Sequence, residues 1–430
     1  MHGLVWALVL GLTLGCPGEV LLADEIEAEI PDTYRSGYGD LEVFGGPAST
    51  AAELKEADRI KSSVLRFHNI EEGLEPWFEW KRRIFEDHGL SLGFDVNWLY
   101  QRASDSLGDR DAFGAIYRLR GEWNAVGRGS SNTGSLVYRV EYRDNHFTDV
   151  APAIFGKEIG AASITTGFAY ASGFGPTVSE FYWKQLFNDK RFGVVVGILD
   201  FGPYFDYYPY TTLGKGFLTR ELLLNPTLAT TGVGHLGAAA KGFIGEHIWL
   251  GGAFYDANAV NGELNLDTWD NGEMLSHVEI GWTPERKRNR TDRVQLTYWE
   301  VDERQEAGIP AGHGWSLSIS GEFWDTFVPF FRVGDTNGGG GAPAEHHVSV
   351  GFGKMLRYDD RFSLALARNK PSRKTNGADL DYEYVVESSY QLQMSQNLSL
   401  LPNVQLIIDS ANYPAKNHIW VFSLRIRLTL

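Results

Sequence analysis

Alternation of apolar and polar residues over about ten positions constrains the fold of this chain more than any other feature. The clearest case is the C-terminal segment, in which Trp420, Phe422, Leu424, Ile426, Leu428 and Leu430 alternate with Ser423, Arg425, Arg427 and Thr429. Successive side chains of a strand point to opposite faces, so this pattern predicts a strand with one apolar and one polar face. The same alternation recurs in segments 90–101, 117–124, 136–143, 278–282, 315–323 and 384–393.

The distribution of charges and aromatic residues separates two kinds of all-β fold. The polar faces carry charges in the middle of the strands, which a soluble sandwich would also allow. Tyrosine and tryptophan, however, mark the strand ends, as at Trp98, Tyr100, Tyr142 and Trp420. An apolar exterior, a polar interior and aromatic girdles are typical of a transmembrane β-barrel, which also pairs every backbone group without an open edge. The sequence therefore favours an antiparallel barrel over residues 89–430 rather than a soluble all-β domain.

The length of the barrel segment predicts its strand number. Residues 89–430 comprise 342 positions (430 minus 88). A tilted strand needs about 10 residues, and short turns alternate with longer loops. At roughly 20 to 22 residues per strand the segment gives about 16 strands, a size that leaves an aqueous channel.

The N-terminal 88 residues follow other patterns. Residues 3–16 form an apolar run that is shorter than the ~20 residues of a spanning helix and suits a signal peptide, predicted here as residues 1–23. Residues 24–88 form a separate segment with short helices expected at 50–63 and 71–89. This segment could plug the periplasmic mouth, contact peptidoglycan or pack inside the barrel.

Composition and motifs exclude several functions. The net charge of −16 argues against a nucleic-acid partner held through phosphate contacts. Cys16 is the only cysteine, so a mature chain lacking the leader would have no disulfide and no thiolate metal site. The sequence shows no nucleophile–base constellation and no metal-ligand cluster. We therefore expect a channel without cofactor or metal rather than an enzyme.

Several segments, in order and over nearly the whole chain from Phe44, resemble the carbohydrate-selective porins of the OprB type. These are FGGP (44–47), PWFEWKRR (76–83), SLVYRVEYR (135–143), FYWKQLF (181–187), NPTLA (225–229), HVEIGWTPER (277–286), VQLTYWEVDER (294–304), GWSLSISGEF (314–323) and the C-terminal stretch 398–430. The resemblance implies a 16-stranded pore in the outer membrane of a Gram-negative bacterium. It also implies passive diffusion of monosaccharides or oligosaccharides, with a preference among them.

Strand parity predicts which charged side chains line the pore. The candidates are Arg118, Arg120, Glu122, Arg139, Glu141, Arg143, Glu279, Arg332, Glu387, Arg425 and Arg427. A basic residue facing lipid at the midplane costs roughly 2 to 4 kcal/mol, which favours the lumen for these side chains. They could contact solute, or they could neutralise one another and keep the wall polar.

Segment 201–224 is the predicted constriction, because prolines and glycines interrupt its strand pattern and aromatic residues crowd it. The candidate residues are Asp200, Tyr204, Phe205, Asp206, Tyr207, Tyr208 and Tyr210. Their rings could stack on sugars, or they could pack against one another in a folded loop.

Two other functions stay open on the sequence alone. A general or cation-favouring porin of the same fold would fit the acidic composition, and a barrel without transport activity is a further alternative. The expected partners are carbohydrate solutes, outer-membrane lipid and the barrel assembly machinery. The oligomeric state is expected to be a monomer or a homotrimer.

Overall fold

The computed structural model describes residues 20–22, 45–167, 170–171, 173–212, 214, 216–229, 234–259 and 267–430. The predicted signal peptide and the following residues up to position 44 lie outside this description, apart from strand β1 (Val20–Leu22). Strand β1 pairs antiparallel with β2 (Leu65–Phe67).

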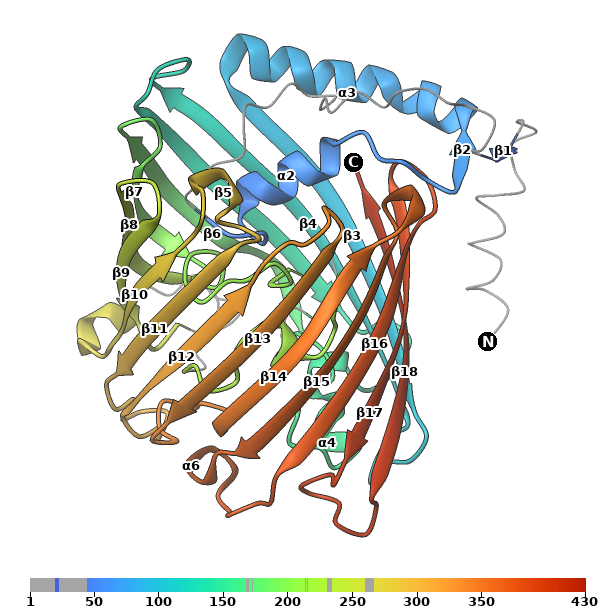
Figure 1. Cartoon of the computed structure of the whole chain (residues 1–430), viewed down its shortest axis with the longest axis vertical. Helices are drawn as coiled ribbons and strands as arrows, with labels where there is room; N and C mark the ends of the chain where they lie inside the picture. The colour runs from blue at the N-terminus through green and yellow to red at the C-terminus, as the bar shows by residue number, and fades with distance from the viewer. Residues whose placement is uncertain are drawn as a thin grey trace.

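A closed antiparallel barrel contains the other sixteen strands of the described residues, each paired with its neighbours in the chain (Figure 1). They are β3 (Leu90–Ala103), β4 (Asp111–Val126), β5 (Thr133–Asp144), β6 (Phe174–Phe187), β7 (Phe192–Leu199), β8 (His235–Ile244), β9 (Ile248–Asp256), β10 (Met274–Trp282), β11 (Arg293–Val301), β12 (Gly312–Ser320), β13 (Phe327–Thr336), β14 (Ala344–Met355), β15 (Arg361–Pro371), β16 (Glu383–Gln393), β17 (Leu398–Ile408) and β18 (His418–Thr429). The ring closes between β18 and β3. The predicted fold class and strand number are confirmed.

The sequence alternation becomes an inside and an outside of the barrel. On β10, the outward Val278, Ile280 and Trp282 are 53%, 50% and 48% exposed, whereas the intervening Glu279 is fully buried. Leu430 closes the seam at one end, because its backbone exchanges hydrogen bonds of 2.9 and 2.8 Å with Phe94. An apolar outer surface and a polar inner surface are what a bilayer and an aqueous lumen require.

The two ends of the barrel differ in the length of their connections. At the end that holds the C-terminus, strands are joined by short segments such as 188–191 and 245–247. At the opposite end the connections 145–173, 200–234 and 257–273 are long. Periplasmic turns of such barrels are short and the outer loops are longer, so the C-terminal end is the periplasmic one.

In the part of the chain that the structure describes, two helices precede the barrel, as expected, although the first ends at Asp58 and residues 59–63 are not helical. Helix α2 (Thr50–Asp58) begins at Ser49, whose side chain accepts a hydrogen bond from the Ala52 amide. Helix α3 (His68–His88) lies along the periplasmic end (Figure 1) and stops at Gly89, whose φ of +74° favours glycine. A buried ion pair of 2.6 Å between Lys81 and Asp58 joins the two helices. Among the described helices, none combines the length and apolar character needed to cross a bilayer.

Helix α2 packs inside the lumen. Leu54 is 1% exposed and lies over Gly93 of β3, where an added Cβ would come within 2.8 Å of its side chain. Short helical turns also interrupt the connections. They are η2 (Pro152–Ile154), α4 (Phe155–Glu158), α5 (Arg220–Leu223), η4 (Asp267–Asn271), η5 (Arg286–Arg288), η6 (Arg357–Asp359) and α6 (Arg373–Asn376).

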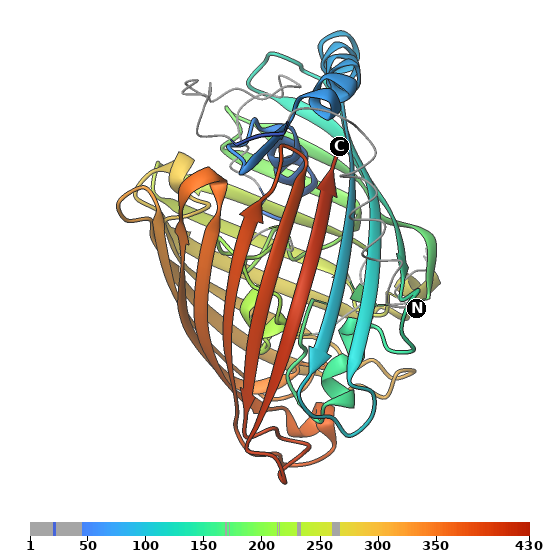
Figure 2. The same ribbon diagram turned by 90° about the vertical axis from the view of Figure 1, so that its right-hand side faces the viewer.

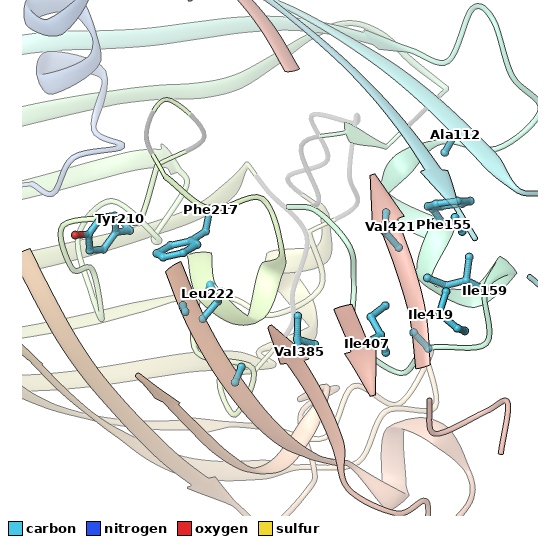
Figure 3. Close-up of a cluster of buried hydrophobic side chains, with 14 of the residues drawn as sticks. Ala112, Phe155, Ile159, Tyr210, Phe217, Leu222, Val385, Ile407, Ile419 and Val421 are labelled. Atoms are coloured by element: carbon cyan, nitrogen blue, oxygen red, sulfur yellow. The ribbon is translucent and has the colours of Figure 1, made fainter. Parts of the chain in front are cut away.

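Two long outer loops fold back into the barrel. Figure 2 shows the connection between β7 and β8, coloured green, within the ring of strands. Tyr210, Phe217 and Leu222 of this loop belong to the same buried cluster as Val385 and Ile407 of the barrel wall (Figure 3). Packed side chains of this loop therefore occupy part of the lumen.

Candidate permeation path

Four arginines on β4 and β5, called here the arginine wall, face one side of the lumen. They are Arg118, Arg120, Arg139 and Arg143, and each is less than 10% exposed. Adjacent strands bring them together because inward residues recur at every second position. Three of them share a single carboxylate: Glu141 lies 2.6 Å from Arg118, 2.9 Å from Arg139 and 2.8 Å from Arg143. Glu141 thus joins three guanidinium groups of this wall.

Further acids hold the arginine wall from its flanks. Arg139 also lies 3.1 Å from Glu180 of β6 and 3.2 Å from Asp200 at the end of β7. Arg120 forms an ion pair with Asp95 of β3. These contacts fix the guanidinium groups in place, since a buried charge is tolerated only when it is paired.

The arginine wall borders a cavity of about 240 Å³ in the middle of the barrel. The other lining residues include aromatic rings from the β7–β8 loop, β9 and β10. Phe201 stacks on Tyr255 with ring centroids 3.4 Å apart, and Phe205 lies parallel to His277 at 5.8 Å. The cavity thus combines guanidinium donors with apolar ring faces, the two features that a sugar can use.

Two other parts of the lumen surface, called here together the carboxylate wall, carry Glu279 on β10 and the pair Glu383 and Glu387 on β16. All three are fully buried. Glu387 accepts hydrogen bonds from the backbone amides of Leu218 and Thr219 at 2.5 and 3.0 Å. These carboxylates hold the inward loops instead of facing open space.

The remaining carboxylates of this wall bind loops in the same way. Glu279 accepts from the amide of Asp206 at 2.8 Å. Glu383 accepts from the amides of Ala162 and Ser163 at 3.0 and 2.8 Å. Glu279 also accepts from Lys241 at 2.8 Å. Backbone amides of an irregular buried loop need such acceptors.

The aromatic residues predicted at the constriction are mostly packed into the wall. Tyr207 is fully buried between Arg293 at 3.8 Å and Lys241 at 4.6 Å from its ring centroid. The guanidinium of Arg332 lies 4.3 Å from the ring of Tyr208. Tyr210 donates to the backbone of the barrel wall at Val328 O over 2.5 Å, and the Tyr204 hydroxyl meets that of Tyr182.

The predicted site residues therefore fall into three groups. The first group borders the central cavity and comprises Arg118, Arg120, Arg139, Arg143, Asp200, Phe205 and Asp206. The second group contacts other residues of the barrel wall or of the inward loops and comprises Glu122, Glu141, Glu279, Arg332, Glu387, Tyr204, Tyr207, Tyr208 and Tyr210. Arg425 is 1% exposed on β18, and Arg427 binds helix α2. The roles of these residues in transport stay predictions.

Sequence reasoning missed several lining residues. Tyr255 and His277 lie on regular strands, so strand parity could have placed them in the lumen. Glu53, which also lines the cavity, carries no such signal because its position depends on helix α2 entering the barrel. It lies 2.5 Å from both Arg427 and the Thr212 hydroxyl.

Burial and neighbouring charges shift the pKa of Glu53 in opposite directions. Burial alone would raise its pKa, but Arg427, Arg120 and the hydrogen bonds from Thr212 and Arg427 outweigh that effect and lower the pKa to about 2. Glu53 is therefore an anion at neutral pH.

Comparison with solved structures supports the fold. The chain is similar to the high-pH structure of Pseudomonas putida OprB, with a TM-score of 0.65 and 14% identity over 81% of this chain and 96% of that one. The low-pH structure of the same protein gives a TM-score of 0.51, also at 14% identity, over 82% and 96%. Among curated proteins, none matches this sequence.

A family model supplies the classification. The model described as carbohydrate-selective porin, OprB family, matches residues 154–430, which is more than half of the chain. These porins are non-enzymatic channels of the outer membrane, in agreement with the closed barrel and the central cavity. The chain belongs to the OprB family of carbohydrate-selective porins.

Proposed function

We propose that this porin passes small sugars by passive diffusion through the central cavity, with a preference for sugars over other neutral solutes of equal size. The observation that supports the proposal is the pairing of two unlike surfaces across one space. The arginine wall lies on one side, and Phe201, Phe205 and Tyr255 lie on another.

The two surfaces suit the two faces of a sugar. Guanidinium groups carry several N–H donors in fixed directions, which hydroxyl groups can accept. The carbon-bound faces of a sugar ring are apolar and can lie against aromatic rings. A solute then exchanges its hydrogen bonds with water for bonds with the wall and leaves again, as a channel requires.

The surroundings of the porin are part of the same proposal. The apolar exterior faces outer-membrane lipid, and residues 1–23 act as the signal peptide for export in a Gram-negative bacterium. The chain works as a monomer or a homotrimer in that membrane.

Swelling of proteoliposomes tests the proposal. Entry rates are measured for monosaccharides, disaccharides and neutral amino acids of matched size. We expect sugars to enter faster than amino acids of the same size, and sugars to block part of the ion conductance. Rates that follow size alone would identify a general porin, and a strong cation preference without sugar block would identify a cation-favouring one.

Variant Phe205→Leu sharpens the test because it keeps the bulk of the side chain and removes the ring. Aromatic contacts contribute about 0.5 to 1.5 kcal/mol, so we expect sugar block to weaken about threefold with small-ion conductance nearly unchanged. Phe254→Leu is the matched control, because Phe254 is 50% exposed on the outer surface. Equal effects of the two variants would contradict a role for the aromatic surface.

A further inference from the structure

A second, much smaller cavity lies next to the central one. It measures about 20 Å³, room for about one water molecule. Its lining includes Ala57 and Lys61 of the N-terminal segment together with Gln393, Ser399 and Arg427 of the barrel wall. These wall positions lie near the periplasmic ends of β16, β17 and β18. The small cavity is therefore on the periplasmic side of the central one.

One ion pair stands between the two cavities. Glu53 lines the central cavity and Arg427 lines the small one. Their side chains meet at 2.5 Å, and the Thr212 hydroxyl donates to Glu53 over the same distance. The contact joins helix α2, the β7–β8 loop and the last strand of the barrel.

The local packing is built around this contact. An added Cβ on Gly214 would come within 2.3 Å of the Arg427 guanidinium, so the absence of a side chain at position 214 leaves room for the arginine. The Thr50 hydroxyl, one turn before Glu53 on α2, donates to Glu180 over 2.8 Å. Helix α2 is thus held by polar contacts to two walls of the lumen.

We propose that Glu53, Arg427 and Thr212 form the periplasmic constriction of this pore, so that the N-terminal helix supplies one side of its narrowest point. The inference rests on the proposed porin function. The proposed constriction would select ions and solutes by charge and size at a place other than the arginine wall. A solute leaving the central cavity passes beside this ion pair, whose two charges are fixed by α2 and β18.

Single-channel recording in planar bilayers tests this constriction independently of sugar selectivity. Glu53→Gln keeps the size of the side chain and removes its charge, so the ratio of anion to cation permeability should rise at least about twofold. Arg427→Gln should shift the same ratio in the opposite direction. Glu53→Ala should increase the conductance, because it also removes the obstruction.

Two further variants separate a local effect from a general one. Gly214→Ala displaces Arg427 without changing any charge and should alter the conductance while leaving the direction of ion preference the same. Glu246→Gln is the control, because Glu246 pairs with Arg191 at an exposed periplasmic turn away from both cavities. Heat-modifiable migration on gels verifies that each variant forms a folded barrel.

The outcomes are decisive in both directions. Opposite shifts for Glu53→Gln and Arg427→Gln, with none for Glu246→Gln, would support the constriction. Folded variants that keep the conductance and ion preference of the unmodified protein would overturn it, whatever the sugar measurements show. If the unmodified protein showed no sugar preference, by contrast, that result would count against the proposed function and not against this constriction.

Discussion

The arginine wall and the carboxylate wall are built by the same rule and have different contacts. Both place buried charged side chains at alternate positions of their strands, although β4 and β5 are adjacent whereas β10 and β16 lie six strands apart in the ring. The arginines on β4 and β5 bind neighbouring acids and border the central cavity. The glutamates on β10 and β16 bind the backbone of inward loops.

The difference follows from the hydrogen-bonding capacity of each side chain. A carboxylate only accepts, and the amides of an irregular loop supply donors that match it. A guanidinium only donates, with five N–H groups, so it can satisfy an acid and still offer a donor to a solute. Strand parity thus determines whether a charged side chain faces the lumen. The hydrogen-bonding capacity of that side chain then determines whether it binds a loop or can bind a solute.

Removal of a loop-binding carboxylate should have the largest effect on stability. Glu387→Ala leaves the amides of Leu218 and Thr219 without their acceptor, and each unpaired buried group costs about 1 to 3 kcal/mol. We expect the free energy of unfolding to fall by about 3 kcal/mol, measured by urea titration in detergent micelles. The released β7–β8 loop should also increase the noise of single-channel currents.

Glu387→Gln is the matched variant for this experiment. Its amide oxygen can still accept a hydrogen bond, so we expect a smaller loss than for alanine. If the two variants and the unmodified protein unfolded alike, the carboxylate wall would have no role in holding the loop.

A change in the arginine wall should affect permeation more than stability. Arg143→Gln leaves Glu141 paired with Arg118 and Arg139, so the free energy of unfolding should change by no more than about 1 kcal/mol. The cavity loses one positive charge, and we expect ion preference to shift toward cations by about twofold. Reversal potentials in a salt gradient measure this shift. A large loss of stability with unchanged ion preference would show that the arginine wall, like the carboxylate wall, mainly stabilises the fold.

The smallest effect is expected from mild acid on helix α2. The pKa of Glu53 is about 2 in the folded protein, below its ordinary value. A lowered pKa contributes stability that is fully present above the ordinary pKa and is lost as the pH falls through about 2. Amide hydrogen exchange in α2, corrected for intrinsic rates, should therefore be nearly the same at pH 7 and pH 5. Marked loss of protection at pH 5 would show that Glu53 is not held by its cationic partners.

The sequence was sufficient for the barrel and for the orientation of its strands. Alternation alone places Val278 outside and Glu279 inside, because a strand has only two faces. It could not reveal that Tyr207 is fully buried. Its cationic neighbours, Arg293 and Lys241, lie on strands 86 and 34 positions away in the chain, and only the closed ring brings them to the loop.

The position of helix α2 was equally beyond sequence reasoning. Its helical pattern is visible around residues 50–58, yet the sequence left plugging, peptidoglycan contact and packing inside the barrel as alternatives. Leu54 fits over Gly93 only because that strand position has no side chain. Such a match between a helix and a distant strand has no signature in local periodicity.

The two faces of strand β18 have independent roles. Trp420 and Phe422 point outward, while Arg427 points inward to the first helix of the lumen. Neighbouring residues are thus subject to different requirements: the outward residues must suit the bilayer, and the inward residues must suit the lumen. Natural variation can retune the interior of this strand without disturbing its fit to lipid, so the strand offers evolution a route to new permeation properties within an unchanged exterior.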